Sequence, residues 1–325
     1  MEIPLKYELT REMVDLISKI EVKKTILDNL QIPNSLVTNL QRQSLLKSSL
    51  FSAKIEGNTL NMKDLHHSME FNSDYKQRLE VENILLAFSF ITKDKHKDLD
   101  IDFIQSLHSI VMKGLSDDLG KIRKEVSAIF NESGFPVYIP PPPSELSELL
   151  NKLTTHINEK TNENILIKAS LVHISFEKTH PFIDGNGRVG RLLFQAILER
   201  EGYGFKRLLS IEELLNDRKG EYYAYLDKND ATSFIEFMLE IINDKAKDIV
   251  DEIGTKKTFS DDLLLPRRKE ILDIIRDHEI MSLDSLRRRF LKVSPRMIRY
   301  DLKKLEEQGY IIKLGTTRGA MYKIK

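Results

Sequence analysis

A run of twelve residues combines several groups that can bind and transfer a phosphate. It reads His180-Pro-Phe-Ile-Asp-Gly-Asn-Gly-Arg-Val-Gly-Arg191. The backbone N–H groups of Gly185, Asn186 and Gly187 can form a nest for an anion at a helix N-terminus. Arg188 and Arg191 are three residues apart, so they share a helix face and can clamp further phosphate oxygens.

Two further side chains in this run add a base and a metal ligand. Asp184 offers a carboxylate beside the nest, and proteins usually hold Mg²⁺ through one or two carboxylates together with substrate phosphates. A neutral imidazole at His180 can accept the proton of an incoming hydroxyl near pH 7. Each residue type alone is commonly structural, but the conjunction predicts a site where a hydroxyl meets a nucleotide with Mg²⁺.

Two helices are expected to position these groups. Ile165, Ala169, Val172 and Phe176 follow the spacing of a helix face, and a second apolar helical pattern begins at Leu192. The glycine-rich turn breaks the first pattern, so the nest lies where the second helix starts.

Other segments predict a mainly α fold with two short β-hairpins. Residues 126–130 and 135–139 flank a turn, and prolines at 140–143 stop this hairpin. Near the C-terminus, helices are expected at about 266–278, 282–290 and 294–308, followed by a two-stranded ribbon at 310–324. Three short helices and a ribbon are typical of a winged helix-turn-helix domain.

Composition narrows the class of protein. The chain has 325 residues, 41% of them hydrophobic and 31% charged, and no cysteine. Disulfides, thiolate catalysis and cysteine metal sites are therefore excluded. No apolar run reaches the length of a membrane span and no signal peptide is recognisable, so we expect a cytoplasmic protein without membrane contact.

The net charge of zero hides an asymmetry. Residues 281–325 hold twelve Lys or Arg and four Asp or Glu, a net charge of +8, whereas residues 1–280 have a net charge of −8. A basic terminal domain on an acidic body is typical of nucleic-acid binding.

The predicted recognition helix carries the side chains for such an interface. They are Arg296, Arg299, Tyr300 and Lys303, and Lys313, Arg318 and Lys323 follow on the wing. This arrangement predicts binding to duplex DNA, with the helix in the major groove. Winged helices also serve as protein-binding or dimerisation modules, so a homodimer is the alternative expectation.

The run at 180–191 matches a known pattern completely. It resembles the Fic family signature His-Pro-Phe-x-Asp/Glu-Gly-Asn-Gly-Arg-x-x-Arg. This resemblance implies a helical core that transfers AMP from ATP to a Ser, Thr or Tyr hydroxyl of a protein, including the enzyme itself, and releases pyrophosphate. It makes His180 the base, Asp184 the Mg²⁺ ligand, and Gly185–Gly187, Arg188, Gly190 and Arg191 the ATP-binding set.

The resemblance extends over roughly residues 35–245. Gly120–Arg123 and the following hairpin are similar to the family's flap, which holds a target segment by adding it as a strand. Residues 221–230 are similar to the segment that contributes to the nucleobase pocket, with Tyr223 and Asn229 as the expected contacts. Plain core packing is the alternative role for these tyrosines.

An N-terminal segment resembles the family's inhibitory motif, Ser/Thr-x-x-x-Glu-Gly/Asn. Ser52 and Glu56 share a helix face, and Gly57 ends that helix. The resemblance implies that Glu56 pairs with Arg191 and takes the place of the ATP γ-phosphate, which makes the chain autoinhibited. The family also offers a second role for this glutamate, in which it aligns a water that removes AMP again.

These patterns together suggest four regions and two rival functions. We expect an N-terminal helical region at 1–78, a Fic catalytic core at 79–245, a linker at 246–262 and a winged helix domain at 263–325. The rivals are a transcription regulator that senses nucleotide without turnover and an enzyme that transfers a different nucleotide monophosphate. The intact base argues against the sensor, because binding alone has no use for His180.

Overall fold

The fold is mainly α-helical, as the sequence predicts. A computed structural model describes residues 1–30, 32, 34–65, 75–93, 98–130, 136–228, 230–257, 264–315 and 319–325. The chain divides into two compact units, one formed by Met1–Gln31 with Val37–Val250 and the other by Ile32–Leu36 with Asp251–Lys325. In the described parts of the chain, no helix is both long and apolar enough to cross a membrane.

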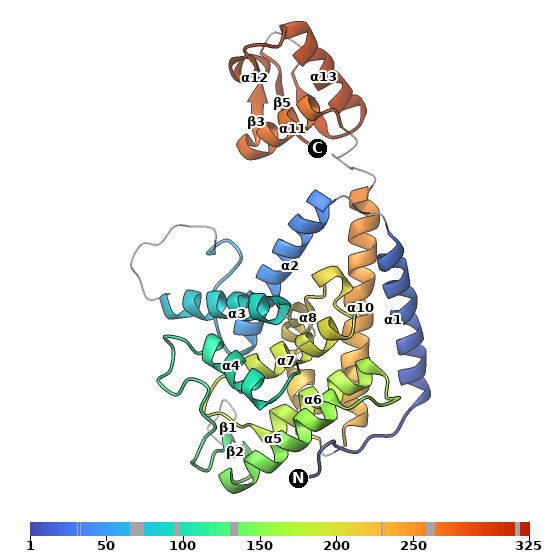
Figure 1. Ribbon diagram of the computed structural model, residues 1–325. Coiled ribbons are helices and arrows are strands. Elements are labelled where there is room, and N and C mark those ends of the chain that lie inside the picture. Colours follow the sequence, from blue (N-terminus) through green and yellow to red (C-terminus); the bar gives the residue numbers. More distant parts are fainter. Residues whose placement is uncertain are drawn as a thin grey trace. The chain divides into compact units, whose positions relative to one another are not determined.

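The first unit is a set of helices with one small hairpin (Figure 1). Its helices are α1 (Arg11–Asn29), α2 (Asn34–Ile55), α3 (Tyr75–Lys93), α4 (Ile101–Val111), α5 (Pro143–Asn158), α6 (Ile165–Thr179), α7 (Asn186–Arg200), the 3₁₀ turn η1 (Phe205–Arg207), α8 (Ile211–Asp217), α9 (Lys219–Asp227) and α10 (Thr232–Lys257).

Helices α6 and α7 form the centre of this unit. Their side chains are buried nearly all round, which an amphipathic surface helix does not show. On one side, Phe90 of α3 stacks on Phe103 of α4 with ring centroids 5.4 Å apart. On the other, His173 of α6 packs against Phe234 of α10 at 5.8 Å. The segment 180–191 thus joins two helices whose side chains are nearly all buried, and its last residues form the start of α7.

The predicted flap hairpin is present and shorter than expected. Strands β1 (Ile129–Phe130) and β2 (Pro136–Tyr138) pair antiparallel, with Ile129 opposite Tyr138. A register irregularity falls between Ile129 and Phe130. Pro136 has no N–H to donate, which limits how far regular pairing extends.

The second unit contains the expected helices and one additional strand. Helices α11 (Pro266–His278), α12 (Leu283–Arg289) and α13 (Pro295–Glu307) agree with the predicted ranges, and β3 (Ile280–Ser282), β4 (Ile311–Leu314) and β5 (Met321–Ile324) form a sheet in the order β3-β5-β4. The predicted two-stranded ribbon is present as β4 and β5, and β3 adds a third strand that the sequence did not indicate. The partner of β3 comes some forty residues later in the chain, so no local pattern marks this short strand.

The segment expected to be a linker begins as helix. Helix α10 continues to Lys257, well into the predicted range 246–262. Ala246, Ile249 and Ile253 are buried at helical spacing, and this packing extends the helix beyond the point where the polar composition suggested a break.

Candidate active site

The candidate catalytic loop lies between α6 and α7. Helix α6 ends at His180, whose backbone is left-handed (φ 46°) and whose N–H donates to the carbonyl of Phe176 at 3.0 Å. Gly185 precedes α7 with φ 80°, a conformation that glycine adopts without strain. Helix α7 therefore begins at Asn186, and the first N–H groups of a helix lack partners within it. The N–H of Gly185 donates to Asp184 Oδ1, so the N–H groups left to receive an anion are those at the start of α7, and the predicted nest stays a prediction.

The side chain of Asn186 forms two hydrogen bonds across this loop. Its Nδ2 donates to the carbonyl of Phe182 at 2.8 Å, and its Oδ1 accepts from the N–H of Phe182 at 2.9 Å. The amide is buried. Asn186 thus offers an anion its backbone N–H, while its side chain, which we expected in the ATP-binding set, fixes the shape of the loop.

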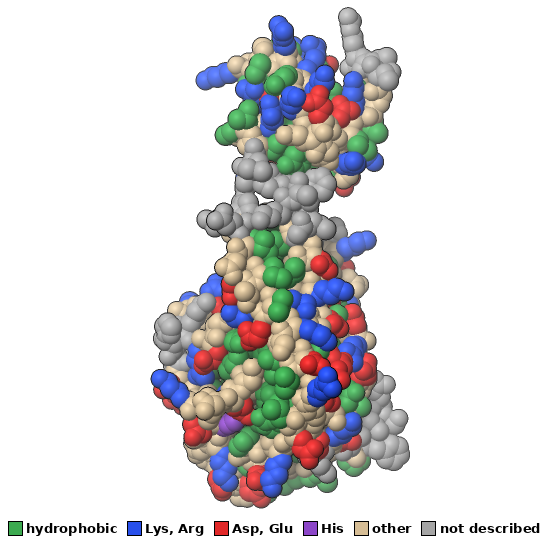
Figure 2. All heavy atoms as spheres, turned by 90° about the vertical axis from the view of Figure 1, so that its right-hand side faces the viewer, with side chains coloured by type: hydrophobic (Ala, Val, Ile, Leu, Met, Phe, Trp, Pro, Cys, Tyr) green, Lys and Arg blue, Asp and Glu red, His purple; other side chains and the backbone are tan. Residues whose placement is uncertain are grey.

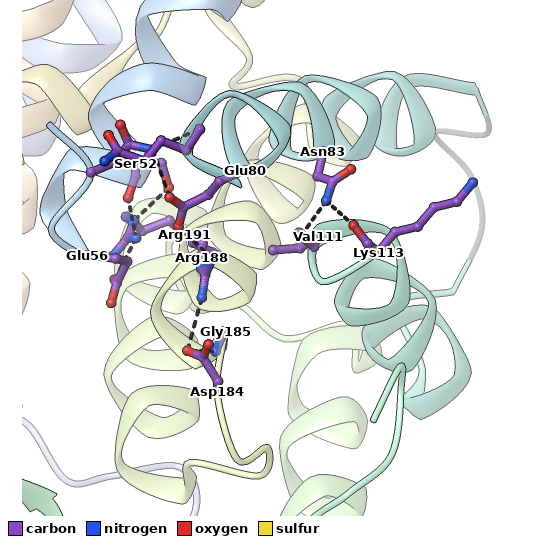
Figure 3. A network of polar contacts seen from close by, with 12 residues as sticks. Ser52, Glu56, Glu80, Asn83, Val111, Lys113, Asp184, Gly185, Arg188 and Arg191 are labelled. Carbon is purple, nitrogen blue, oxygen red and sulfur yellow. Dashed lines mark hydrogen bonds and ion pairs between the residues drawn. The ribbon is translucent and has the colours of Figure 1, made fainter. Parts of the chain in front are cut away.

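The structure brings Ser52 and Glu56 to Arg191 (Figure 3). The Arg191 guanidinium donates from Nε to Ser52 Oγ at 3.0 Å, and one amino group donates to the Ser52 carbonyl at 2.9 Å and to Glu56 Oε1 at 2.8 Å. The Arg191 side chain is only 2% exposed. Burial opposes its charge, but the acidic groups around it, with Glu56 the foremost of them, together outweigh burial and raise the pKa of Arg191 above its ordinary value.

Glu56 lies over the start of α7. A Cβ atom added to Gly187 would overlap Oε1 of Glu56. The carboxylate therefore occupies the space above the helix N-terminus, where the nest would receive an anion. Gly57 has φ 102° and follows the end of α2 at Ile55, as the sequence predicted.

Arg188 points to different partners from Arg191. One amino group donates to Glu80 of α3 at 2.6 Å and the other to Asp184 Oδ1 at 3.0 Å. Spacing correctly indicated two arginines on one side of α7, but not that a carboxylate 108 positions away would hold the first of them. Sequence reasoning missed Glu80, because nothing near it in the chain marks the contact.

His180 has the properties of a base that is neutral at pH 7. Burial lowers the pKa of its imidazole below the ordinary 6.5, and the nearby charge of Arg123 acts in the same direction. Its Nδ1 is buried and has no hydrogen-bond partner in the described part of the chain. The loop itself is held by Arg123, whose Nε donates to the His180 carbonyl at 2.8 Å.

A second histidine, which sequence reasoning missed, braces the loop from α4. The ring of His108 stacks on Phe182 with centroids 3.9 Å apart. Its Nδ1 accepts the N–H of Gly120 at 2.9 Å, which leaves the proton on Nε2 to be donated to the Asp184 carbonyl at 3.1 Å. His108 thus joins the loop to the segment that leads into the flap.

Asp184 is the residue that could hold Mg²⁺. Its side chain is 68% exposed, and its Oδ1 accepts from Arg188 and from the N–H of Gly185 at 2.6 Å. Among the described residues, no group of three or more His, Cys, Asp or Glu could hold a metal ion. One exposed carboxylate beside an anion nest fits a Mg²⁺ ion that takes its other ligands from phosphates and water.

The remaining predicted contacts have mixed outcomes. Gly190 faces α6, and a Cβ atom there would overlap the carboxyl group of Glu177, so this glycine allows close helix packing, and its contact with ATP stays a prediction. Tyr223 is partly exposed, and its Oη donates to the carbonyl of Ile55 at the end of α2 at 3.4 Å. Asn229 lies outside the described residues.

Comparison with known families agrees with this geometry. Residues 98–198 match the model of the Fic/DOC family, and this range contains α6, the loop and the arginines of α7. These residues form a Fic/DOC family domain.

Relatives of the Fic domain extend the similarity beyond that range. The chain is 26% identical over 238 residues to protein adenylyltransferase Fic of Drosophila willistoni and 25% identical over 236 residues to protein adenylyltransferase fic-1 of Caenorhabditis elegans. Each match covers 69% of this chain, and 45% and 44% of the two relatives. The chain therefore matches less than half the length of these proteins.

Solved structures show the same fold. A Fic family protein from Desulfovibrio desulfuricans superposes with a TM-score of 0.77 at 24% identity, over 100% of this chain and 98% of that protein. Fic-1 from C. elegans superposes with a TM-score of 0.62 at 21% identity, over 76% and 74% of the two chains.

The second unit carries the candidate nucleic-acid interface. Residues 267–317 match the DeoR-like helix-turn-helix domain. Lys and Arg are the commoner charged side chains on the face of this unit seen in Figure 2. The predicted contacts are all exposed on α13, namely Arg296, Arg299, Tyr300 and Lys303.

The packing of α13 turns this face outward. On its inner side, Asp301 is buried and accepts from Arg267 at 2.6 Å and from Arg268 at 3.0 Å. The Arg268 guanidinium and the Lys304 ammonium lie 5.5 Å and 5.9 Å from the ring centre of Tyr300, a cation–π arrangement. The wing residue Arg318 lies outside the described residues.

Proposed function

We propose that the chain is an autoinhibited protein adenylyltransferase, which transfers AMP from ATP to a Ser, Thr or Tyr hydroxyl of a protein and releases pyrophosphate. The observation that carries this proposal is the carboxylate of Glu56, which binds Arg191 directly above Gly187. The relatives named protein adenylyltransferase support the reaction class.

The groups of the loop account for each step of transfer. His180 accepts the proton of the target hydroxyl, whose oxygen attacks the α-phosphorus in line while the bond to the β-phosphate oxygen breaks. The N–H groups at the start of α7 and the side chain of Arg191 receive the phosphate oxygens. Mg²⁺ at Asp184 would neutralise charge on the phosphates.

The restraint is a competition for Arg191. Glu56 and a terminal phosphate are both anions that suit the guanidinium and the nest, and they cannot occupy the same space. With Glu56 in place, ATP binds only in a pose that misaligns its α-phosphate with the attacking hydroxyl. Removal of the carboxylate frees both the arginine and the nest.

Labelled ATP tests the reaction and the restraint together. We expect Glu56→Gly to raise AMP incorporation into protein, including the chain itself, by tenfold or more. The variant lacks the ion pair with Arg191 that favours the restrained state, and a factor of ten corresponds to about 1.4 kcal/mol. Glu56→Gln keeps the size of the side chain and separates loss of charge from the added backbone freedom of glycine. Its expected effect is smaller and in the same direction.

The double variant Glu56→Gly/His180→Ala is the control for the base, and it is expected to lose the label. Incorporation that is unchanged in Glu56→Gly contradicts the restraint, and label that persists without His180 contradicts the role of the base. Parallel reactions with the other nucleoside triphosphates test whether AMP is the group transferred.

DNA binding is a second candidate function, favoured by the exposed cations of α13. Salt-dependent binding of the full chain to duplex DNA tests it, because contacts to phosphates release counterions. Binding that does not weaken as salt rises contradicts this proposal and favours a protein partner for the same surface.

A further inference from the structure

Glu80 of α3 belongs to the polar network in Figure 3, where it contacts Arg188. Its side chain is 14% exposed, and its Oε1 accepts the amino group of Arg188 at 2.6 Å. Its Oε2 accepts Nδ2 of Asn58 at 2.8 Å. Asn58 is itself fixed, because Nδ2 also donates to the Gln77 carbonyl and Oδ1 accepts the N–H of Leu60. Glu80 is therefore held in one place from both sides.

Arg188 is shared between two carboxylates. Its side chain is 7% exposed, so water screens its charge poorly. One amino group binds Glu80 and the other binds Asp184 Oδ1 at 3.0 Å. Since Asp184 is the most exposed member of this chain of contacts, it is the one that can exchange partners.

We propose that Glu80 is a positioning residue: it binds Arg188, keeps it from pairing fully with Asp184, and so keeps Asp184 available to Mg²⁺. The inference rests on the proposed role of Asp184 in metal binding. While Glu80 neutralises part of the guanidinium charge and fixes its orientation, Arg188 makes a single hydrogen bond to Asp184. Without the charge of Glu80, the guanidinium turns to Asp184, the remaining carboxylate among its described partners, and can take both of its oxygens. Arg188 then competes with the metal ion.

Mg²⁺ titrations of ATP binding test this proposal without relying on turnover. The full chain carrying Glu56→Gly is titrated with ATP by calorimetry at a series of Mg²⁺ concentrations, with and without Glu80→Gln. We expect E80Q to raise the Mg²⁺ concentration for half-maximal ATP affinity about five- to tenfold, a typical coupling between two sites. ATP affinity in excess EDTA is expected to stay the same.

Glu82→Gln is the matched control, because Glu82 is an exposed residue of the same helix. It should leave the Mg²⁺ dependence unchanged. Thermal unfolding of each variant checks the fold. If E80Q does not fold, Glu80→Asp, which keeps the charge but shortens the reach to Arg188, should shift the Mg²⁺ dependence in the same direction by less.

Two results overturn the inference. One is an unaltered Mg²⁺ dependence in a folded E80Q protein. The other is tighter ATP binding by E80Q to the same extent with Mg²⁺ and with EDTA, which would make Glu80 a competitor of phosphate.

Asp184→Asn separates the role of Glu80 from the metal assignment on which it rests. If D184N loses the Mg²⁺ dependence and E80Q does not shift it, only the role of Glu80 fails. If D184N changes nothing, the metal assignment fails and this inference with it.

Discussion

His180 is positioned by its backbone more than by hydrogen bonds to its ring. Its left-handed conformation ends α6, its carbonyl accepts from Arg123, and its Nδ1 has no partner in the described part of the chain. The residue types of the loop predict a base, because a histidine combined with a glycine-rich helix start, an aspartate and two arginines suits proton transfer from a hydroxyl. The conformation that aims the ring depends on contacts with Arg123, which is 57 positions away.

The pH dependence of transfer should reflect the burial of this ring. Only the neutral imidazole accepts a proton, and burial holds the pKa of His180 below 6.5. In the Glu56→Gly variant we expect the rate to be level near pH 7 and to fall about tenfold per unit once the pH is below that pKa. Initial rates of AMP incorporation between pH 5 and 8 measure this, and a fall that begins above pH 7 would contradict it.

Glu177 is a buried acid that the proposed reaction does not use. Burial raises its pKa to about 8, and the charge of Glu56 adds to this against the opposing effect of Arg191. The folded chain therefore keeps Glu177 protonated at neutral pH, while the unfolded chain ionises it near 4.5. Its contribution to stability is complete below pH 4.5 and is lost as the pH rises to about 8.

Substitution of this acid tests the sign of that dependence. Glu177→Gln keeps the shape and cannot ionise, so we expect it to gain stability over the parent chain between pH 5 and pH 8, on the order of a few kcal/mol. The difference in free energy of unfolding between the two chains, measured by denaturant titration at each pH, isolates this group. A difference that is constant with pH rules out the raised pKa.

Helix α4 supports the catalytic loop through one side chain. His108→Phe keeps the stack on Phe182 but removes the acceptor for Gly120 and the donor to Asp184. We expect a loss of about 1–3 kcal/mol in stability, because buried backbone groups lose their partners. We also expect transfer in the Glu56→Gly background to fall about tenfold, because small displacements of reacting groups are costly.

An exposed change on the same helix provides the comparison. Asp102→Asn alters α4 away from the loop and should leave both quantities unchanged. Equal transfer by His108→Phe and Asp102→Asn would show that the brace has no part in catalysis.

At the scale of elements, local signals predicted most of the structure. Proline at the start of α13, with Ser294 as its N-cap, and Gly309 beyond its end mark that helix clearly. The features that local signals did not predict depend on distant partners: β3 needs β5, and the end of α10 needs neighbours that bury Ile253. In the site, Glu80 and His108 were missed for the same reason, since each acts through a contact far along the chain.

The whole chain is neutral only because two opposite charges cancel. The basic C-terminal part and the acidic remainder were visible in the sequence, and the structure adds that four of the candidate contacts lie exposed on one helix. The charge of this surface, more than the overall charge, governs encounter with a polyanion.

A single substitution on this surface should change the response to salt. Arg299→Ala is expected to weaken binding of the full chain to duplex DNA and to reduce the slope of log affinity against log salt by about one if the side chain contacts one phosphate. Arg11→Ala, an exposed arginine of α1, should leave the slope as it is. Identical slopes for both variants would exclude Arg299 from the interface.

The absence of a side chain at Gly187 limits how this chain could lose the proposed restraint by mutation. The same open space admits both the carboxylate of Glu56 and, by our proposal, a phosphate group. A larger residue at 187 would expel the inhibitor and the substrate together, so it cannot yield an active enzyme. Unregulated variants must instead arise at Glu56 or in the part of α2 that carries it, and a selection for constitutive activity should recover substitutions there and none at 187 or 191.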